Sequence, residues 1–142
     1  MRFERRFVTP KSPSESLRLI ADFRNLKEWD DSVVSVKPMD SSFGQGSRFL
    51  VEVLFSGNLI EIEYTVTVYE PGIRAELSGT AAKATATDII EVSRVSDGTQ
   101  VDYIAEIRLA FPFSIFDPLL AIGFKKTVDH AVSGLTRFLS AQ

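Results

Sequence analysis

The hydrophobic positions of the chain change their spacing along its length, and the last spacing is that of a long helix. From Asp117 to Leu139, apolar residues recur at steps of three and four, which places them on one face of an α-helix. Asp117 is a favourable N-cap, and Pro118 suits the first helical position. At about 1.5 Å per residue this helix is a rod of roughly 34 Å, whose apolar stripe needs a curved sheet to cover it. The stripe consists of Leu120, Phe124, Val128, Ala131, Leu135 and Phe138.

The N-terminal part of the chain predicts one strand followed by two short helices. Residues 2–9 alternate between apolar and polar side chains, as an edge strand does. Ser12 can cap a helix, and Glu15 can reach back to complete a capping box. We expect this helix to continue to about Phe23 and a second short helix to occupy Leu26–Trp29.

Between these helices and the long one, the apolar positions alternate with a period of two, which is typical of strands that bury one face. Turn residues such as Ser56-Gly57-Asn58 and Asp97-Gly98 separate the segments, so neighbouring strands are antiparallel. The predicted strands are Val34–Val36, Arg48–Phe55, Leu59–Tyr69, Ile73–Ser78, Lys83–Val95 and Val101–Leu109. The pattern predicts one α+β domain over residues 1–142, in which a curved antiparallel sheet of six to seven strands wraps around the C-terminal helix.

Composition excludes several classes of function. The net charge is −3 with both signs interspersed, which argues against nucleic acid as a partner. The chain has no cysteine, so disulfides, thiolate catalysis and cysteine-based zinc sites are excluded. The N-terminal residues are too polar for a signal peptide, and no apolar run reaches the ~20 residues of a membrane span. We therefore expect a cytoplasmic protein without a membrane span.

Three segments resemble the polyketide cyclase/dehydrase and lipid-transport branch of the START and birch-pollen-allergen (SRPBCC) superfamily. They are Ala21–Asp30, with its Asn-Leu followed by Trp-Asp, the loop and strand start Gly44–Phe49, and the hairpin Asp97–Tyr103. The resemblance implies the helix-grip fold and a cavity between sheet and helix that holds a small hydrophobic molecule. The branch has no universal catalytic motif that this sequence could match.

Asp88 is the most informative polar residue on a predicted inner face. It alternates with apolar residues such as Ala86 and Ile90, where a carboxylate would lose its hydration and its pKa would rise. It could then accept a hydrogen bond from a ligand hydroxyl or act as a general acid or base. Alternatively, a bulge or a register shift turns Asp88 outward, or it lies at the cavity mouth. We favour this second interpretation, because alternation fails near bulges.

Tyr64, Tyr103 and Trp29 are the other residues with a polar atom on the expected cavity side. Each tyrosine hydroxyl could anchor a polar group of the ligand, or be a core residue satisfied by backbone or water. Trp29 would bridge the second short helix and the sheet, or else form part of the cavity wall. The small side chains Ala84, Ala86 and Ala105 leave volume for a ligand, or for a helix that packs close to the strands.

Two further features concern metals and surface contacts. His130 is the only histidine, and its helical position points to solvent or to the rim of the cavity, so we predict no metal site and no cofactor. The connector before the long helix carries four bulky apolar residues, which could cap the cavity, guard its entrance or form a contact patch: Phe111, Phe113, Ile115 and Phe116.

The sequence thus leaves three functional hypotheses, which we give in order of preference. The first is non-covalent binding, with possible transport, of a lipid, isoprenoid, sterol-like or polyketide-like compound. The second is a cyclase or dehydratase in which Asp88, the candidate catalytic residue, moves protons together with a tyrosine, and the third is a protein-interaction module with a filled core. The predicted ligand contacts are Trp29, Val53, Phe55, Ile62, Tyr64, Leu77, Asp88, Ile90, Tyr103, Ala105, Phe113, Phe116, Leu120, Phe124 and Val128.

Overall fold

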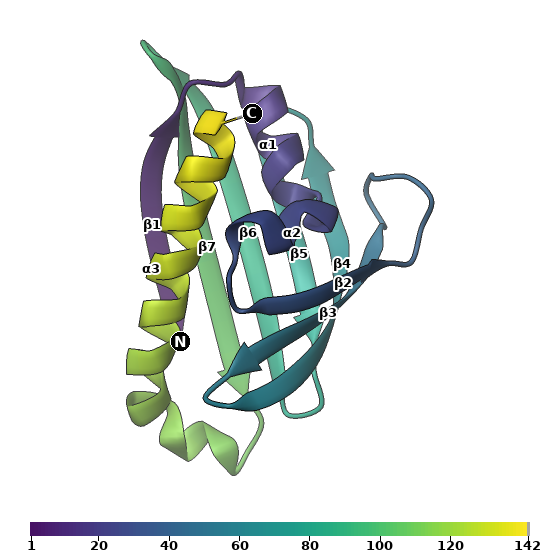
Figure 1. Ribbon diagram of the computed structural model, residues 1–142, viewed down its shortest axis with the longest axis vertical. Coiled ribbons are helices and arrows are strands. Elements are labelled where there is room, and N and C mark those ends of the chain that lie inside the picture. Colours follow the sequence, from purple (N-terminus) through teal and green to yellow (C-terminus); the bar gives the residue numbers. More distant parts are fainter. Residues whose placement is uncertain (142) are drawn as a thin grey trace.

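A computed structural model describes residues 1–141, including all of their side chains except those of Phe116 and Asp117. The chain forms one antiparallel sheet, two short helices, two 3-10 turns and one long helix (Figure 1). The elements are, in order, β1 Arg2–Thr9, α1 Pro13–Ala21, η1 Phe23–Asn25, α2 Leu26–Trp29, β2 Val33–Pro38, β3 Arg48–Phe55, β4 Asn58–Glu70, β5 Arg74–Thr80, β6 Ala84–Val95, β7 Gly98–Leu109, η2 Phe113–Phe116 and α3 Asp117–Ala141.

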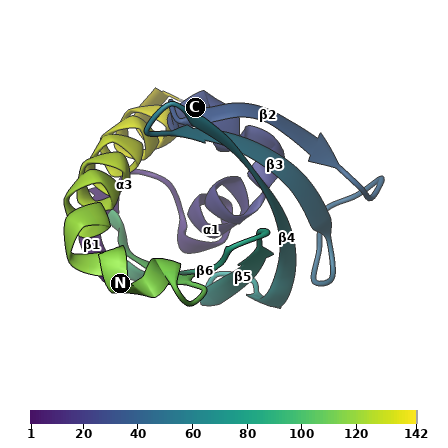
Figure 2. The ribbon, with the colours of Figure 1, turned by 90° about the horizontal axis from the view of Figure 1, so that it is seen from below.

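The sheet has seven strands in the order β1-β7-β6-β5-β4-β3-β2, and every neighbouring pair is antiparallel. Seen from below in Figure 2, the curved sheet and α3 together form a ring, with α1 behind its centre. This is the predicted α+β helix-grip architecture, and β1 lies at an edge as its alternating pattern predicts. The long helix continues to Ala141, two residues beyond its predicted end at Leu139. Its predicted N-cap residue, Asp117, lies outside the described side chains.

The first helix begins as the sequence predicts but ends earlier. The Ser12 hydroxyl accepts a hydrogen bond from the Glu15 amide at 3.2 Å, which satisfies one of the free N–H groups of the first turn. The helix ends at Ala21 rather than at Phe23, because Asp22 leaves the helical conformation and caps the following 3-10 turn. The Asp22 carboxylate accepts from the Arg24 amide at 3.2 Å and forms an ion pair with the Arg24 side chain.

The hydrophobic core lies where α1 and the C-terminal half of α3 cover the sheet. Leu17 and Ile20 of α1 and Leu135 and Leu139 of α3 are completely buried there. Gly134 allows α3 to approach α2 closely, since a Cβ at this position would lie 2.1 Å from the Trp29 carbonyl oxygen. The opposite half of α3 faces a hollow.

Candidate functional site

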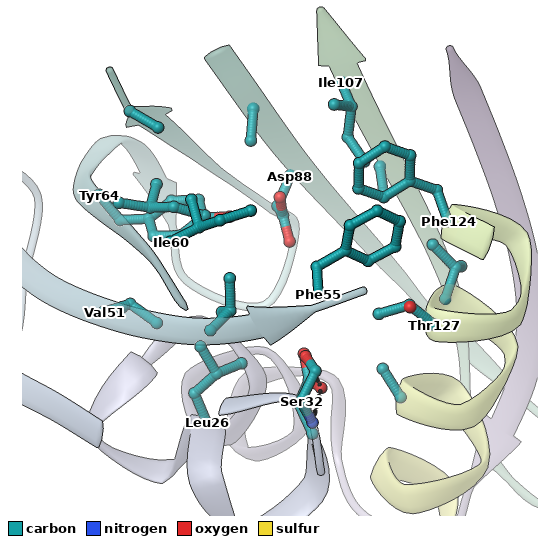
Figure 3. A pocket seen from close by; sticks show the side chains of 18 of the residues that line it. Leu26, Ser32, Val51, Phe55, Ile60, Tyr64, Asp88, Ile107, Phe124 and Thr127 are labelled. Atoms are coloured by element: carbon teal, nitrogen blue, oxygen red, sulfur yellow. Dashed lines mark hydrogen bonds between the residues drawn. The ribbon is translucent and has the colours of Figure 1, made fainter. Parts of the chain in front are cut away.

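A cavity of about 200 Å³ lies between the sheet, the α2 segment and the middle of α3 (Figure 3). Its wall is mainly aliphatic and aromatic, with a few polar groups, the composition expected of a small-molecule site. The wall consists of Phe23, Leu26, Trp29, Asp30, Ser32, Val51, Val53, Leu54, Phe55, Ile60, Ile62, Tyr64, Ala81, Ala84, Thr85, Ala86, Asp88, Tyr103, Ala105, Ile107, Leu109, Phe124, Thr127, Val128, Ala131 and Val132.

Most of the predicted ligand contacts are part of this wall, namely Trp29, Val53, Phe55, Ile62, Tyr64, Asp88, Tyr103, Ala105, Phe124 and Val128. Leu77 and Ile90 are on the correct face of the sheet but are completely buried in the core instead. The reason is that α1 packs on β5 and β6 at that end. Phe113 and Leu120 lie outside the wall, and Phe116 lies outside the described side chains.

Apart from Trp29, sequence reasoning missed the part of the wall that comes from α2 and the residues that connect it to β2. Leu26, Asp30 and Ser32 line the cavity from the side opposite the sheet. Strand alternation does not reach this segment, so no periodic pattern marked these residues. The signal that could have found them is the Asn-Leu-x-x-Trp-Asp segment itself, which contains Leu26 and Asp30.

Asp88 projects into the cavity from β6. It is paired with Leu77 on β5 and with Ala105 on β7, and the pairing of β6 with both neighbours is free of bulges. The interpretation that a bulge or register shift turns Asp88 outward is therefore wrong. The side chain is half-buried, and its remaining accessible surface belongs to the cavity wall.

The environment of Asp88 favours its protonated form. Burial raises the pKa of its carboxyl from 3.8 to about 6. The Tyr103 hydroxyl donates a hydrogen bond to Asp88 Oδ2, which opposes this rise, while the nearby negative charge of Asp30 adds to it. An acid with a pKa near neutrality can both donate and accept a proton at physiological pH.

The two tyrosines of the wall differ in how their hydroxyls are satisfied. The hydroxyl of Tyr103 is bonded to Asp88, whereas that of Tyr64 has no hydrogen-bond partner among residues 1–141. The Tyr64 ring fits against Gly79, where a Cβ would lie 2.7 Å from Tyr64 Cε1. Burial raises the pKa of both phenols well above their ordinary value, so both stay protonated at neutral pH.

A second carboxylate, Asp30, lies on the other side of the cavity. Its Oδ1 accepts hydrogen bonds from the Ser32 amide at 3.0 Å and from the Ser32 hydroxyl at 2.7 Å. Burial raises the pKa of Asp30 despite these two bonds. In Figure 3, Ser32 approaches the pocket from the wall that faces Asp88.

Trp29 combines the two roles that the sequence left open. Its ring lies edge-to-face against Tyr103, with 6.1 Å between the ring centroids, and so connects α2 to the sheet. The same ring is part of the cavity wall. Its Nε1 is buried and has no hydrogen-bond partner in the described part of the chain.

Two phenylalanines connect the β3–β4 hairpin to the long helix. The rings of Phe55 and Phe124 are stacked, with 4.2 Å between centroids and an interplanar angle of 3° (Figure 3). Leu54 and Thr85, which lie near the ends of β3 and β6, also belong to the wall, and both are exposed.

The apolar connector does not cover the cavity. Phe111 and Ile115 are 83% and 65% exposed, and neither belongs to the cavity wall. Phe113 is also partly exposed, and its ring lies under the Lys83 ammonium, with 4.7 Å from Nζ to the ring centroid. For these three residues, the expected role of capping the cavity is wrong, while a guard at its entrance and a contact patch stay predictions.

His130 is exposed, as its helical position predicts. Among the described residues, no group of three or more His, Asp or Glu side chains is placed to hold a metal ion. Within the same part of the chain, none of the helices has the length and apolar character that crossing a membrane requires.

The sequence matches the family described as polyketide cyclase/dehydrase and lipid transport over residues 1–139. A match of this extent shows that the chain belongs to that family, and it confirms the resemblance seen in the sequence. The family as a class binds small hydrophobic molecules. No curated protein sequence matches the chain.

Several solved structures share the fold at low sequence identity. The Zhui aromatase/cyclase from Streptomyces sp. R1128 is 10% identical with a TM-score of 0.80, over 98% of this chain and 93% of that one. Protein TTHA0849 from Thermus thermophilus is 19% identical with a TM-score of 0.74, over 96% and 95%. Ara h 8.0201 is 7% identical with a TM-score of 0.71, over 98% and 97%. At these identities the similarity extends to the fold alone.

Proposed function

We propose that this protein binds, and carries, a small hydrophobic molecule in the cavity under α3. The observation that supports the proposal is a mainly apolar hollow of about 200 Å³ between the sheet and α3. Burying apolar ligand surface there contributes about 25 cal/mol per Å². Asp88 and the tyrosine hydroxyls supply the polar contacts that fix the orientation of the ligand.

The proposal is tested by native mass spectrometry of the purified protein, with extraction and identification of any small molecule that copurifies. A second measurement uses the neutral fluorescent probe N-phenyl-1-naphthylamine. We expect the probe to bind the wild-type protein and to lose at least about tenfold in affinity in Ala86→Phe, which fills the cavity. The matched control is Ala82→Phe, because Ala82 is exposed and lies outside the wall. Equal binding to all three proteins would contradict a site in the cavity.

A second candidate function is a cyclase- or dehydratase-type enzyme that uses the same cavity. The observation that favours it is the hydrogen-bonded pair of Asp88 and Tyr103 in an apolar wall. Such a pair can exchange a proton with a bound substrate. Incubating the extracted compound with wild-type protein and with Asp88→Asn distinguishes the two functions. Conversion by the wild type alone indicates the enzyme, whereas binding without conversion by either protein indicates the carrier.

A further inference from the structure

The charged residues that face the cavity all have the same sign. Asp30 and Asp88 belong to the wall, and no lysine, arginine or histidine of the described residues does. Neither carboxylate forms an ion pair with any other residue in the described part of the chain. Charges act strongly on each other in an apolar space, so these two acids dominate the electrostatics of the site.

Each of these carboxylates has one oxygen left over. Asp88 uses Oδ2 to accept the bond from Tyr103, and Asp30 uses Oδ1 for both bonds from Ser32. The other oxygen of each has no hydrogen-bond partner among the groups that the structure describes. A purely apolar ligand that expelled water would leave these two oxygens unsatisfied, which is costly. A ligand with several N–H donors would satisfy them.

The two carboxylates also repel each other. The negative charge of Asp30 contributes to the rise in the pKa of Asp88, so the charge of Asp30 acts on Asp88 across the cavity. The other groups that act on them are Tyr103 at Asp88, and Ser32, Asp31 and the exposed His130 at Asp30. A bound anion would add a third negative charge, whereas a bound cation would relieve the repulsion. Aromatic rings in the wall further favour a cation.

We infer that the cavity selects a hydrophobic amine, held as an ammonium ion between Asp88 and Asp30, with its apolar body toward the stacked rings of Phe55 and Phe124. This inference rests on the proposed function and narrows its ligand to one class. It excludes fatty acids and other hydrophobic carboxylates as preferred ligands, because their head group would face two carboxylates.

The test compares three probes that share a naphthylmethyl group: the amine 2-(1-naphthyl)ethylamine, the alcohol 2-(1-naphthyl)ethanol and the carboxylate (1-naphthyl)acetate. Affinities are measured by isothermal calorimetry at pH 8, where the amine is protonated and Asp88 is ionised. We expect the amine to bind at least about tenfold more tightly than the alcohol, and the carboxylate at least about tenfold more weakly than the alcohol. Binding of the alcohol tests the proposed function independently.

Variants test whether the two carboxylates cause the preference for the amine over the alcohol. Asp88→Asn and Asp30→Asn should each lower the ratio of amine to alcohol affinity toward one. Asp97→Asn is the matched control, since Asp97 is exposed in the β6–β7 turn and lies outside the wall, and it should keep the wild-type ratio. Equal affinities for amine and alcohol, or tighter binding of the carboxylate, would overturn the inference and leave the proposed function standing. Failure of all three probes would count against the proposed function itself.

Discussion

The two halves of α3 meet the same sheet in different ways. Toward its C-terminus the helix presents Leu135 and Leu139, which are completely buried against the core, and Gly134 lets it touch the backbone of α2. Toward its N-terminus the residues facing inward, such as Phe124 and Val128, line a hollow instead. One helix therefore supports both a close-packed end and an open end of the molecule.

The strands beneath the helix explain this difference. Along β6 the inward residues are Ala84, Ala86 and Asp88 at the open end, followed by Ile90 and Val92 at the closed end. Short side chains on the strand leave a gap that large ones fill, and α1 covers only the closed end. The close-packed core and the proposed ligand cavity thus occupy separate stretches of the same strand and helix, so mutations should separate stability from ligand binding.

The sharpest test of the difference between the two halves of α3 replaces one leucine in each half. Leu135→Ala should reduce the free energy of unfolding by about 2–5 kcal/mol, because Leu135 is completely buried and its removal leaves a cavity. Leu120→Ala should cost much less, since Leu120 is only partly buried and lies outside both the core and the cavity wall. Urea denaturation of both variants measures the difference. Equal losses would mean that the two ends of α3 are held equally tightly.

Two glycines of α3 provide a second matched pair. Gly134→Ala should destabilise the protein by about 1–3 kcal/mol, because the new methyl group meets the Trp29 carbonyl oxygen, a backbone atom that cannot turn away. At Gly123 a Cβ would lie 3.1 Å from Phe55 Cζ, the edge of a side chain that can shift. Gly123→Ala should therefore be close to neutral, helped by the better helix propensity of alanine. Thermal unfolding followed by circular dichroism compares the two, and a larger loss in Gly123→Ala would contradict the comparison.

Much of this fold could be predicted from the sequence, because periodicity reports which face of an element is buried. The antiparallel sheet, its edge strand β1 and the long helix all follow from spacing. Periodicity does not report what covers that face. Leu77 and Tyr64 look alike in the pattern, but α1 covers the first and the cavity adjoins the second. The same limit hid Asp30, which reaches the site from a loop.

The inward position of Asp88 makes the open end sensitive to pH. The pKa of this carboxyl is about 6 in the folded state against 3.8 as the ordinary value, so the folded state holds the proton more tightly. The stability of the wild-type protein should therefore fall as pH rises from about 4 to 6 and level off above, by at most about 3 kcal/mol from this group. Asp88→Asn removes the contribution of Asp88 to this decline and should stabilise the protein at pH 8 by about 1–2 kcal/mol. The exposed Asp97→Asn should keep the wild-type profile, and a decline of unchanged size in Asp88→Asn would show that another group, such as Asp30, causes it.

The smallest effect concerns the hydrogen bond that moderates this pKa. Tyr103→Phe keeps the ring in the wall but removes the hydroxyl that donates to Asp88 Oδ2, the one contact that lowers the pKa of this acid. The pKa of Asp88 should consequently rise above about 6, since burial and the charge of Asp30 remain. Titration of the Asp88 carboxyl carbon by NMR measures it in the wild type and in the variant. Tyr69→Phe is the control, because Tyr69 packs against Phe43 away from the cavity and should leave the pKa unchanged. A wild-type value at or below 3.8 would place Asp88 in water or beside a cation and would remove the distinction between the two ends of β6.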